Sequence, residues 1–218
     1  MKRVLVLAAL AAAVVAPSAA ATNECRGLTV CVPVVGPWVV TGSAQRVEYD
    51  LSCTARFVVA GLDAELSRRG IDVGFVGALG SPVNPGITTS RDVVFLGRVV
   101  RGPRVGASFR PHIGCIPAQG GAQRAPTAYH PVPPARPVDR RVREIAATGT
   151  RIVTARCPKG ELLSSATHAI GFYGPAPPTA AAIGAVHVAQ STRAGVVTLH
   201  VHSSAGAVVQ LDLICVAP

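Results

Sequence analysis

The sequence is short of aromatic side chains, of lysine and of charge. Only 4% of its 218 residues are aromatic, with a single tryptophan, and 15% are charged. Its 22 glycines and 18 prolines leave little room for long helices, because both residue types destabilise a helix interior. A hydrophobic share of 49% is nevertheless enough for a folded core. The composition therefore argues against helical bundles, coiled coils and disordered polyelectrolytes.

The motifs of common enzymes are also missing. The sequence has no G-x-S-x-G nucleophile elbow, no H-E-x-x-H zinc motif, no P-loop and no dinucleotide fingerprint. Asp63 and Glu65 would share one face of a strand, which is more typical of a solvent-facing strand than of a catalytic acid and base. We assign no catalytic residue and expect a protein that is not an enzyme and has no cofactor.

The first 21 residues have the three-part layout of a secretory signal peptide. Lys2 and Arg3 precede the apolar run Val4–Ala16, and small residues end at Ala21. The run has 13 residues, fewer than the roughly 20 that a membrane-spanning helix needs. We therefore expect cleavage near Ala21, a secreted, extracellular protein, and no membrane span after cleavage.

The remaining chain is basic, and its cations are almost all arginines. Without Lys2 and Arg3, 19 of the 21 basic residues remain against 11 acidic ones, a formal charge of about +8. Export makes nucleic acid an improbable partner, whereas an anionic cell-wall polymer fits the same electrostatics. The arginine excess also fits the codon usage of a GC-rich genome, and the densest group could be a solvated strand face. That group contains Arg136, Arg140, Arg141 and Arg143.

The chain repeats itself once, and a repeat indicates the architecture before any motif does. Each copy has a cysteine, a strand containing G-F, a proline-rich turn, valine-rich strands and a second cysteine. The first copy has Cys53, Val73–Gly77 and Cys115, and the second has Cys157, Ile170–Gly174 and Cys215. Because the repeat preserves Phe75 and Phe172, we expect both to be core anchors.

Apolar and polar residues alternate with the period of strands over 47–53, 93–97, 197–202 and 209–213. We therefore predict an all-β fold with two tandem modules that resemble β-sandwiches or barrels. The first module is expected over 22–117 and the second over 138–218. Residues 118–137, rich in proline and glycine, are expected to link them.

The six cysteines of an exported chain are expected to form disulfides, because the extracellular compartment is oxidising. Six cysteines allow 15 connectivities, and spacing alone does not choose among them. The repeat does, because equivalent positions should do equivalent jobs. It predicts Cys53–Cys115 and Cys157–Cys215, and leaves Cys25–Cys31.

Two kinds of residue are candidates for ligand binding. His200 and His202 lie on one side of a predicted strand and could chelate a divalent metal if a neighbouring strand supplied a third ligand. The simpler interpretation is the polar face of a half-buried strand. Sugar recognition requires exposed aromatic side chains, and the candidates beside glycine and proline are Trp38, Tyr129 and Tyr173.

Several motifs resemble those of a family of small secreted proteins from high-GC, actinobacterial-type bacteria. They are the C-P-K-G-E run at 157–161, the H-A-I-G-F-Y run at 168–173, the G-S-P-V-N-P-G-I-T-T run at 80–89 and the stretch Phe109–Pro117. The resemblance covers most of the chain after the signal peptide. It implies a secreted protein with disulfides and supplies no catalytic residue.

Taken together, these patterns predict a secreted, non-catalytic protein that binds at or near the cell envelope. Its partner would be a cell-wall polymer or an extracellular protein. The binding candidates are Trp38, Tyr129, Tyr173, Arg140, Arg141 and Arg143. One alternative is an exported hydrolase of a polysaccharide or cell-wall polymer. Another is a metal-binding envelope protein that uses His200 and His202.

Overall fold

A computed structural model describes residues 22–28, 30–41, 46–76, 91–118 and 138–218. The predicted signal peptide, Tyr129 and all but the first residue of the predicted linker lie outside the described residues. As predicted, the fold is all-β, with one short helix. No helix in the described ranges is long and apolar enough to cross a membrane.

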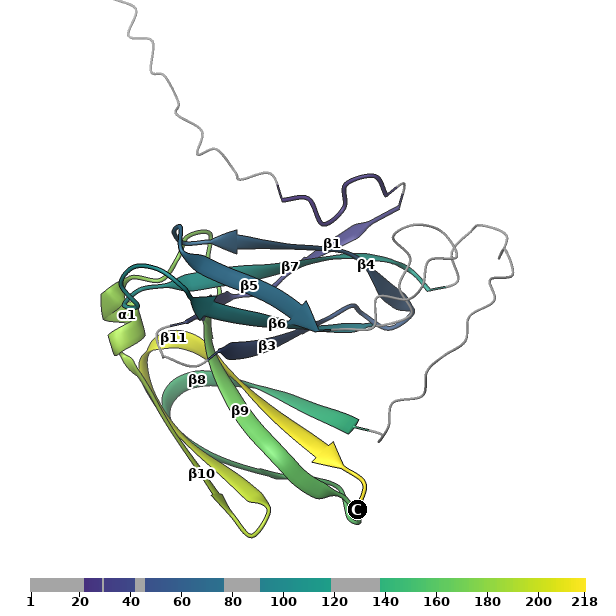
Figure 1. The fold of residues 1–218 in the computed structure, drawn as a ribbon. Coiled ribbons are helices and arrows are strands. Elements are labelled where there is room, and N and C mark those ends of the chain that lie inside the picture. Colours follow the sequence, from purple (N-terminus) through teal and green to yellow (C-terminus); the bar gives the residue numbers. More distant parts are fainter. Residues whose placement is uncertain (1–21, 29, 42–45, 77–90, 119–137) are drawn as a thin grey trace, which may run out of the picture.

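The strands form two sheets, and the larger one contains strands from both halves of the sequence (Figure 1). Seven strands come before residue 118: β1 (Val32–Val35), β2 (Trp38–Val40), β3 (Val47–Ser52), β4 (Phe57–Leu66), β5 (Ile71–Val76), β6 (Asp92–Val99) and β7 (Ser108–Pro117). The others are β8 (Val138–Arg156), β9 (Leu162–Phe172), β10 (Val186–Arg193) and β11 (Val196–Val216), with helix α1 (Ala180–Gly184) between β9 and β10.

The eight-stranded sheet has the path β1-β7-β2-β9-β11-β10, with β4 paired to β7 and β8 paired to β11. Strand β2 joins its two parts. Its Val39 lies opposite Phe109 of β7 on one side and opposite Gly171 of β9 on the other. At Gly171 a Cβ atom would come within 2.6 Å of Pro37 Cγ, so the close approach of β2 to β9 requires glycine there.

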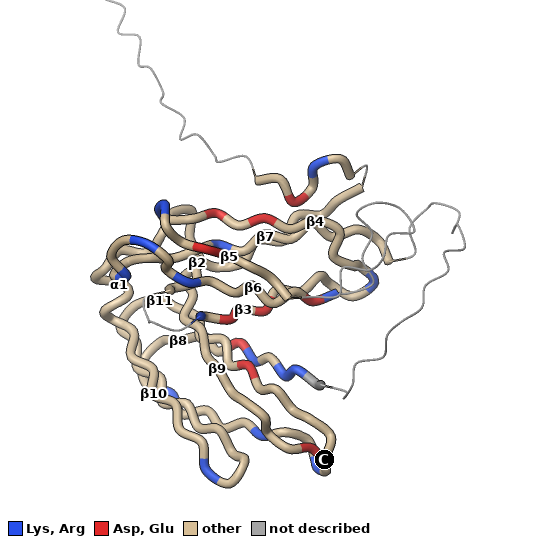
Figure 2. The backbone as a smooth tube through the Cα atoms, in the orientation of Figure 1, with Lys and Arg blue, Asp and Glu red and all other residues tan. Residues whose placement is uncertain are grey.

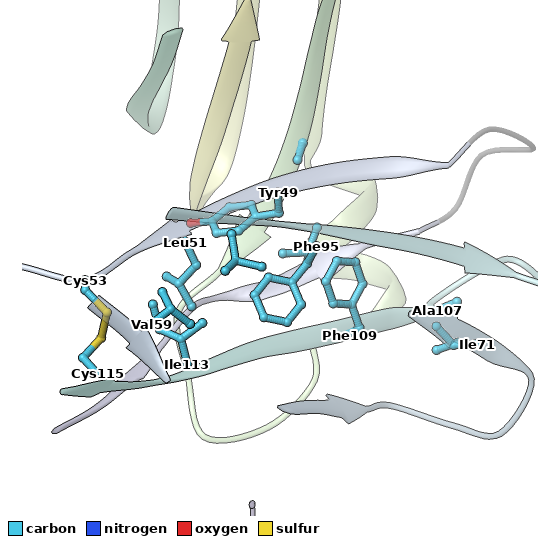
Figure 3. Close-up of a cluster of buried hydrophobic side chains, with 13 residues drawn as sticks. Tyr49, Leu51, Cys53, Val59, Ile71, Phe95, Ala107, Phe109, Ile113 and Cys115 are labelled. Atoms are coloured by element: carbon cyan, nitrogen blue, oxygen red, sulfur yellow. A yellow bond between two sulfur atoms is a disulfide. The ribbon is translucent and has the colours of Figure 1, made fainter. Parts of the chain in front are cut away.

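The three-stranded sheet β3-β6-β5 covers one face of the first part of the larger sheet (Figure 1). Tyr49 of β3 and Phe95 of β6 pack toward Phe109 and Ile113 of β7, and all four are at most 2% exposed (Figure 3). This first core lies between the sheets because β3, β6 and β7 each present alternate apolar residues to it.

The second core is built by two unusually long strands. Strand β11 has 21 residues and pairs with the 19-residue β8 on one edge. On its other edge it pairs first with β10 and then with β9. The register shifts between Ser203 and Ala207, and such irregularities bend a strand. The bent pair encloses a cluster around Leu199, Leu211 and Leu213.

Two expectations about the repeat have different outcomes. Phe172 is buried at the end of β9, as expected of a core anchor. Phe75 is 48% exposed on β5, an edge strand of the smaller sheet, so its predicted role as a core anchor is wrong. The two G-F motifs lie in different sheets, which explains why they have different burial.

The structure contains the three disulfides that the sequence predicted. They join Cys25 to Cys31, Cys53 to Cys115 and Cys157 to Cys215. Cys215 lies in β11, whereas Cys157 follows the end of β8. Because Cys215 also pairs in register with the beginning of β8, this disulfide brings the two ends of β8 together.

Removing the Cys157–Cys215 disulfide should cost more stability than removing the Cys25–Cys31 disulfide. They close separations of 58 and 6 residues, which corresponds to about 4 and about 2 kcal/mol in the chain-entropy model. Urea unfolding of C157A/C215A and of C25A/C31A measures both losses. Equal losses would contradict the expectation that loop length sets the difference.

The N-terminal segment packs closely against two paired glycines. Gly61 of β4 lies opposite Gly114 of β7. A Cβ atom at Gly61 would lie 1.7 Å from the carbonyl oxygen of Glu24, and one at Gly114 would lie 2.2 Å from the same oxygen. This close approach of the Glu24 backbone is therefore possible because neither residue has a side chain.

Gly61→Ala should push the Cys25–Cys31 loop off the sheet. The added methyl group collides with backbone, and overpacking of this kind costs about 1–3 kcal/mol. Limited trypsin cleavage at the exposed Arg26 should become faster, and urea unfolding should show the loss of stability. Gly74→Ala on β5 is the matched control, because nothing lies within 4 Å of its added Cβ. If both variants behaved alike, the packing of the Cys25–Cys31 loop would not depend on Gly61.

Candidate functional site

The contact between the two parts of the protein is polar and buried. Strand β3 is an edge strand of the smaller sheet, so part of its backbone lacks a partner strand. Gln210 of β11 replaces that strand: its Oε1 accepts the Asp50 N–H at 2.6 Å, and its Nε2 donates to the Asp50 carbonyl at 2.9 Å. Gln210 is 5% exposed, and its buried amide thus satisfies the backbone N–H and carbonyl of Asp50 on the open edge of β3.

The Asp50 side chain lies beside this contact and has an unusual acidity. Burial raises its pKa to about 6, and the nearby Asp92 carboxylate adds to the increase. The Ser52 hydroxyl donates to both carboxylates and, together with Arg140, opposes the shift. A carboxyl group that keeps its proton to mildly acidic pH suggests a catalytic acid. Here, however, it is enclosed in the contact between the sheets.

A second polar group at the same contact joins two tyrosines to one carboxylate. The hydroxyls of Tyr49 and Tyr173 donate to Oε1 of Glu144 at 2.8 and 3.2 Å. Burial and the Glu144 carboxylate raise the pKa of both tyrosines. Tyr173 is 63% exposed, so it is the one predicted aromatic candidate that the structure places at the surface.

Trp38 is not exposed, so it does not offer a surface on which a sugar could stack. It is 4% exposed in β2, and the Arg110 guanidinium lies 6.0 Å from its ring centroid. The glycine and proline beside it suggested a loop, but they precede a strand that both parts of the sheet enclose. Tyr129 lies outside the described residues.

Arg140 is predicted to bind a ligand, but in the structure it forms ion pairs within the protein. Its guanidinium pairs with Glu48 of β3 at 2.9 Å and with the buried Asp212 of β11. These contacts use Arg140 to hold β3 against β8 and β11. The other two arginines predicted for binding, Arg141 and Arg143, are exposed.

A buried histidine links the N-terminal loop to the sheet. His112 of β7 has Nδ1 3.6 Å from Glu24 Oε1 and Nε2 3.2 Å from Glu65 Oε1. Asp63 accepts the backbone N–H of Asn23 at 2.7 Å. Asp63 and Glu65 do share a face of β4, as predicted, but both anchor the loop. His112 is 3% exposed, so this group has no access to a polymer substrate.

A basic depression lies where the Cys157–Cys215 disulfide draws the ends of β8 together. Its volume is about 500 Å³, and Arg141, Arg156 and Lys159 line it together with Cys157 and Pro158. Arg141 is opposite Leu213, two residues before Cys215, and Arg156 directly precedes Cys157. The disulfide therefore explains why cations 15 residues apart in sequence meet.

The depression was only partly predictable from the sequence. Arg141 belongs to the arginine group that was singled out, whereas Arg156 and Lys159 were missed. The sequence does hold one indication of their role. Arg156 and Lys159 lie on either side of a predicted disulfide cysteine, in the run R-C-P-K. Figure 2 shows basic residues at the beginning of β8 and near the C-terminal end of the chain.

The histidines of the second half fall into two groups. His168 Nδ1 lies 2.8 Å from Gln190 Oε1, and Gln190 Nε2 donates to the Ala166 carbonyl, so this group ties β9 to β10. His200 and His202 are exposed on one face of β11, as the alternation predicted. Strand β10 adds a third exposed histidine, His187, directly opposite His202.

Comparison with known proteins yields no match to a family model, to a curated protein or to a solved structure.

Asp50→Asn should make stability less dependent on pH. The free carboxyl group ionises near pH 3.8, whereas in the folded protein its pKa is about 6. The folded state therefore binds more protons between these values, and its free energy of unfolding falls as pH rises through that window. An asparagine avoids this loss, which amounts to at most about 3 kcal/mol at pH 7 and to nothing below pH 3.

Urea unfolding of wild type and D50N from pH 3 to pH 7 measures this difference. Asp92→Asn is the companion variant: it removes the neighbouring charge, so an NMR titration should show a lower Asp50 pKa. A difference between wild type and D50N that did not change with pH would refute the raised pKa.

Proposed function

We propose that this chain is a secreted, non-catalytic binding protein that recognises an anionic group of a cell-envelope polymer. The observation that carries the proposal is the basic depression of Arg141, Arg156 and Lys159 beside the Cys157–Cys215 disulfide. Three cations around one depression of about 500 Å³ suit a phosphate or carboxylate group. Three disulfides fit an oxidising, extracellular compartment.

The charge around the depression supports the proposal. None of the described residues that line it is acidic, and Glu161, which follows in the same turn, is not among them. Arg156 and Lys159 are exposed, as is Arg143 on β8. The formal charge of about +8 on the chain after residue 21 would attract a polyanion over a longer range.

The structure favours arginine-based binding over binding by aromatic side chains. Of the three predicted aromatics, Trp38 is buried and Tyr129 lies outside the described residues. Tyr173 is exposed, but Glu144 already accepts its hydroxyl hydrogen bond. A single aromatic ring offers a small stacking surface for a neutral sugar chain.

The alternative of an exported hydrolase has less support. Its carboxylate candidates form structural contacts: Asp50 lies at the contact between the sheets, and Glu65 pairs with the buried His112. The architecture of two repeated modules stays a proposal as well. The similar disulfide separations of 62 and 58 residues support it, whereas the different sheets of the two G-F motifs do not.

Binding to a phosphate polymer should depend on the depression. We expect the triple variant R141Q/R156Q/K159Q to bind purified teichoic acid or inorganic polyphosphate at least about tenfold more weakly. The slope of log affinity against log salt should fall by roughly 0.7–0.9 for each phosphate that the variant no longer neutralises. Titration at two or more salt concentrations, followed by fluorescence anisotropy, measures both quantities.

The control variant removes the same charge elsewhere. R101Q/R104Q/R193Q changes three exposed arginines, two in the β6–β7 connection and one at the end of β10. It should retain most of the affinity. Equal weakening by both triple variants would show that net charge, and not this depression, drives binding. Absence of binding by wild type would refute the proposed function.

A further inference from the structure

We propose that His187, His200 and His202 form a binding site for one divalent transition-metal ion of the Zn²⁺ or Cu²⁺ type. The site lies on the exposed face of β10 and β11, separate from the basic depression. Two of the ligands, His200 and His202, lie on one strand, and a neighbouring strand has to supply the third. Strand pairing supplies it, because His187 of β10 lies directly opposite His202 of β11.

The register places all three imidazoles on one face of the sheet. Residues directly opposite in an antiparallel pair point to the same side, as do residues two apart on one strand. His187 and His202 are such a cross-strand pair, and His200 lies two residues before His202. Cβ atoms are about 4.5–5.5 Å apart in a direct pair and about 7–8 Å apart across the diagonal. Three side chains at these spacings can meet at one ion.

The surroundings are open to an ion. The three histidines and Thr150 are among the residues that line a depression of about 500 Å³. Its other lining residues are apolar, and of these Val186 and Val188, which flank His187, point to the opposite face of the sheet. All three histidines are exposed. As the side chains stand, no group of three His, Cys, Asp or Glu residues in the described ranges is placed to hold a metal ion. The proposed site therefore requires the three imidazole rings to rotate toward one another. Exposed side chains change rotamer within picoseconds to nanoseconds.

Thr150 of β8 is suited to orient one of the ligands. It lies opposite His202, and its Oγ1 is 2.9 Å from His202 Nδ1. A partner on one ring nitrogen fixes the imidazole so that the other nitrogen, here Nε2, faces the ion. Thr150 is thus a positioning residue, and the three histidines are the ligands.

The ligand set defines the class of ion. Three neutral imidazoles with an open fourth position suit Zn²⁺ and Cu²⁺, whereas Mg²⁺ and Ca²⁺ prefer oxygen ligands. All six cysteines are in disulfides, so no thiolate competes for the ion. Of the remaining histidines, His112 is buried and His168 is held by Gln190.

The test uses the oxidised chain from residue 22 to 218, without a polyhistidine tag. Isothermal titration with Zn²⁺, and Cu²⁺ electron paramagnetic resonance for nitrogen ligation, should show one ion per chain. We expect H187Q, H200Q and H202Q each to weaken Zn²⁺ binding by more than about 100-fold, which exceeds the roughly 10–100-fold cost of losing an outer partner. Each variant should keep the thermal midpoint of the metal-free wild type, because the three positions are exposed.

Two further variants make the outcome specific. T150V should weaken binding by about tenfold, and T150S should restore it, because serine retains the hydroxyl group. H130Q, which removes the sixth histidine outside the described residues, should bind like wild type. If H187Q bound like wild type, the site would be at most a two-histidine chelate and the proposal would be wrong. Absence of saturable binding, or an equal loss in H130Q, would also overturn it.

Discussion

The three residues of β2 join the two parts of the large sheet, because among the described residues no other strand pairs with strands of both parts. Val39 has strand neighbours on both sides, and Gly171 lets β9 approach closely enough to pair. The second link, from Gln210 to the backbone of Asp50, then satisfies the edge of the smaller sheet. A strand of three residues forms few hydrogen bonds, so the buried side-chain contacts across the same boundary matter for its stability.

These contacts occupy several polar residues inside the protein. Arg140, Glu144 and Asp50 lie at the boundary between β3 and the long strands. There Arg140 pairs with Glu48, Glu144 accepts a hydrogen bond from Tyr49, and the Asp50 backbone is bound by Gln210. A buried charge without a partner is expensive, and such groups are therefore paired. The functional candidates lie on the exposed surface of the second half. They are the basic depression at the ends of β8 and the histidine face of β10 and β11.

Much of the fold could be predicted because it follows from local rules. Alternation located β3, β6 and β11, since a strand with one buried face requires a period of two. The disulfides followed from the positions of six cysteines in two similar copies. The burial of individual side chains was harder to predict than the position of the strands. Trp38 and Phe75 have similar local sequence surroundings, rich in valine, glycine or proline, but one is enclosed by neighbouring strands and the other lies on an edge.

The sequence by itself determined the strand composition and the shared face of His200 and His202, because both depend on spacing along the chain. It indicated the cysteine pairing through the similarity of its two halves, and not through spacing alone. Only the tertiary structure decided which charges are used internally and which gather at the surface. Arg140 and Arg141 are adjacent, but the former pairs with Glu48, whereas the latter meets Arg156 at the disulfide. His187 likewise became a neighbour of His202 through strand register. Contacts of this kind depend on how distant strands pair and bend, and no local pattern encodes that.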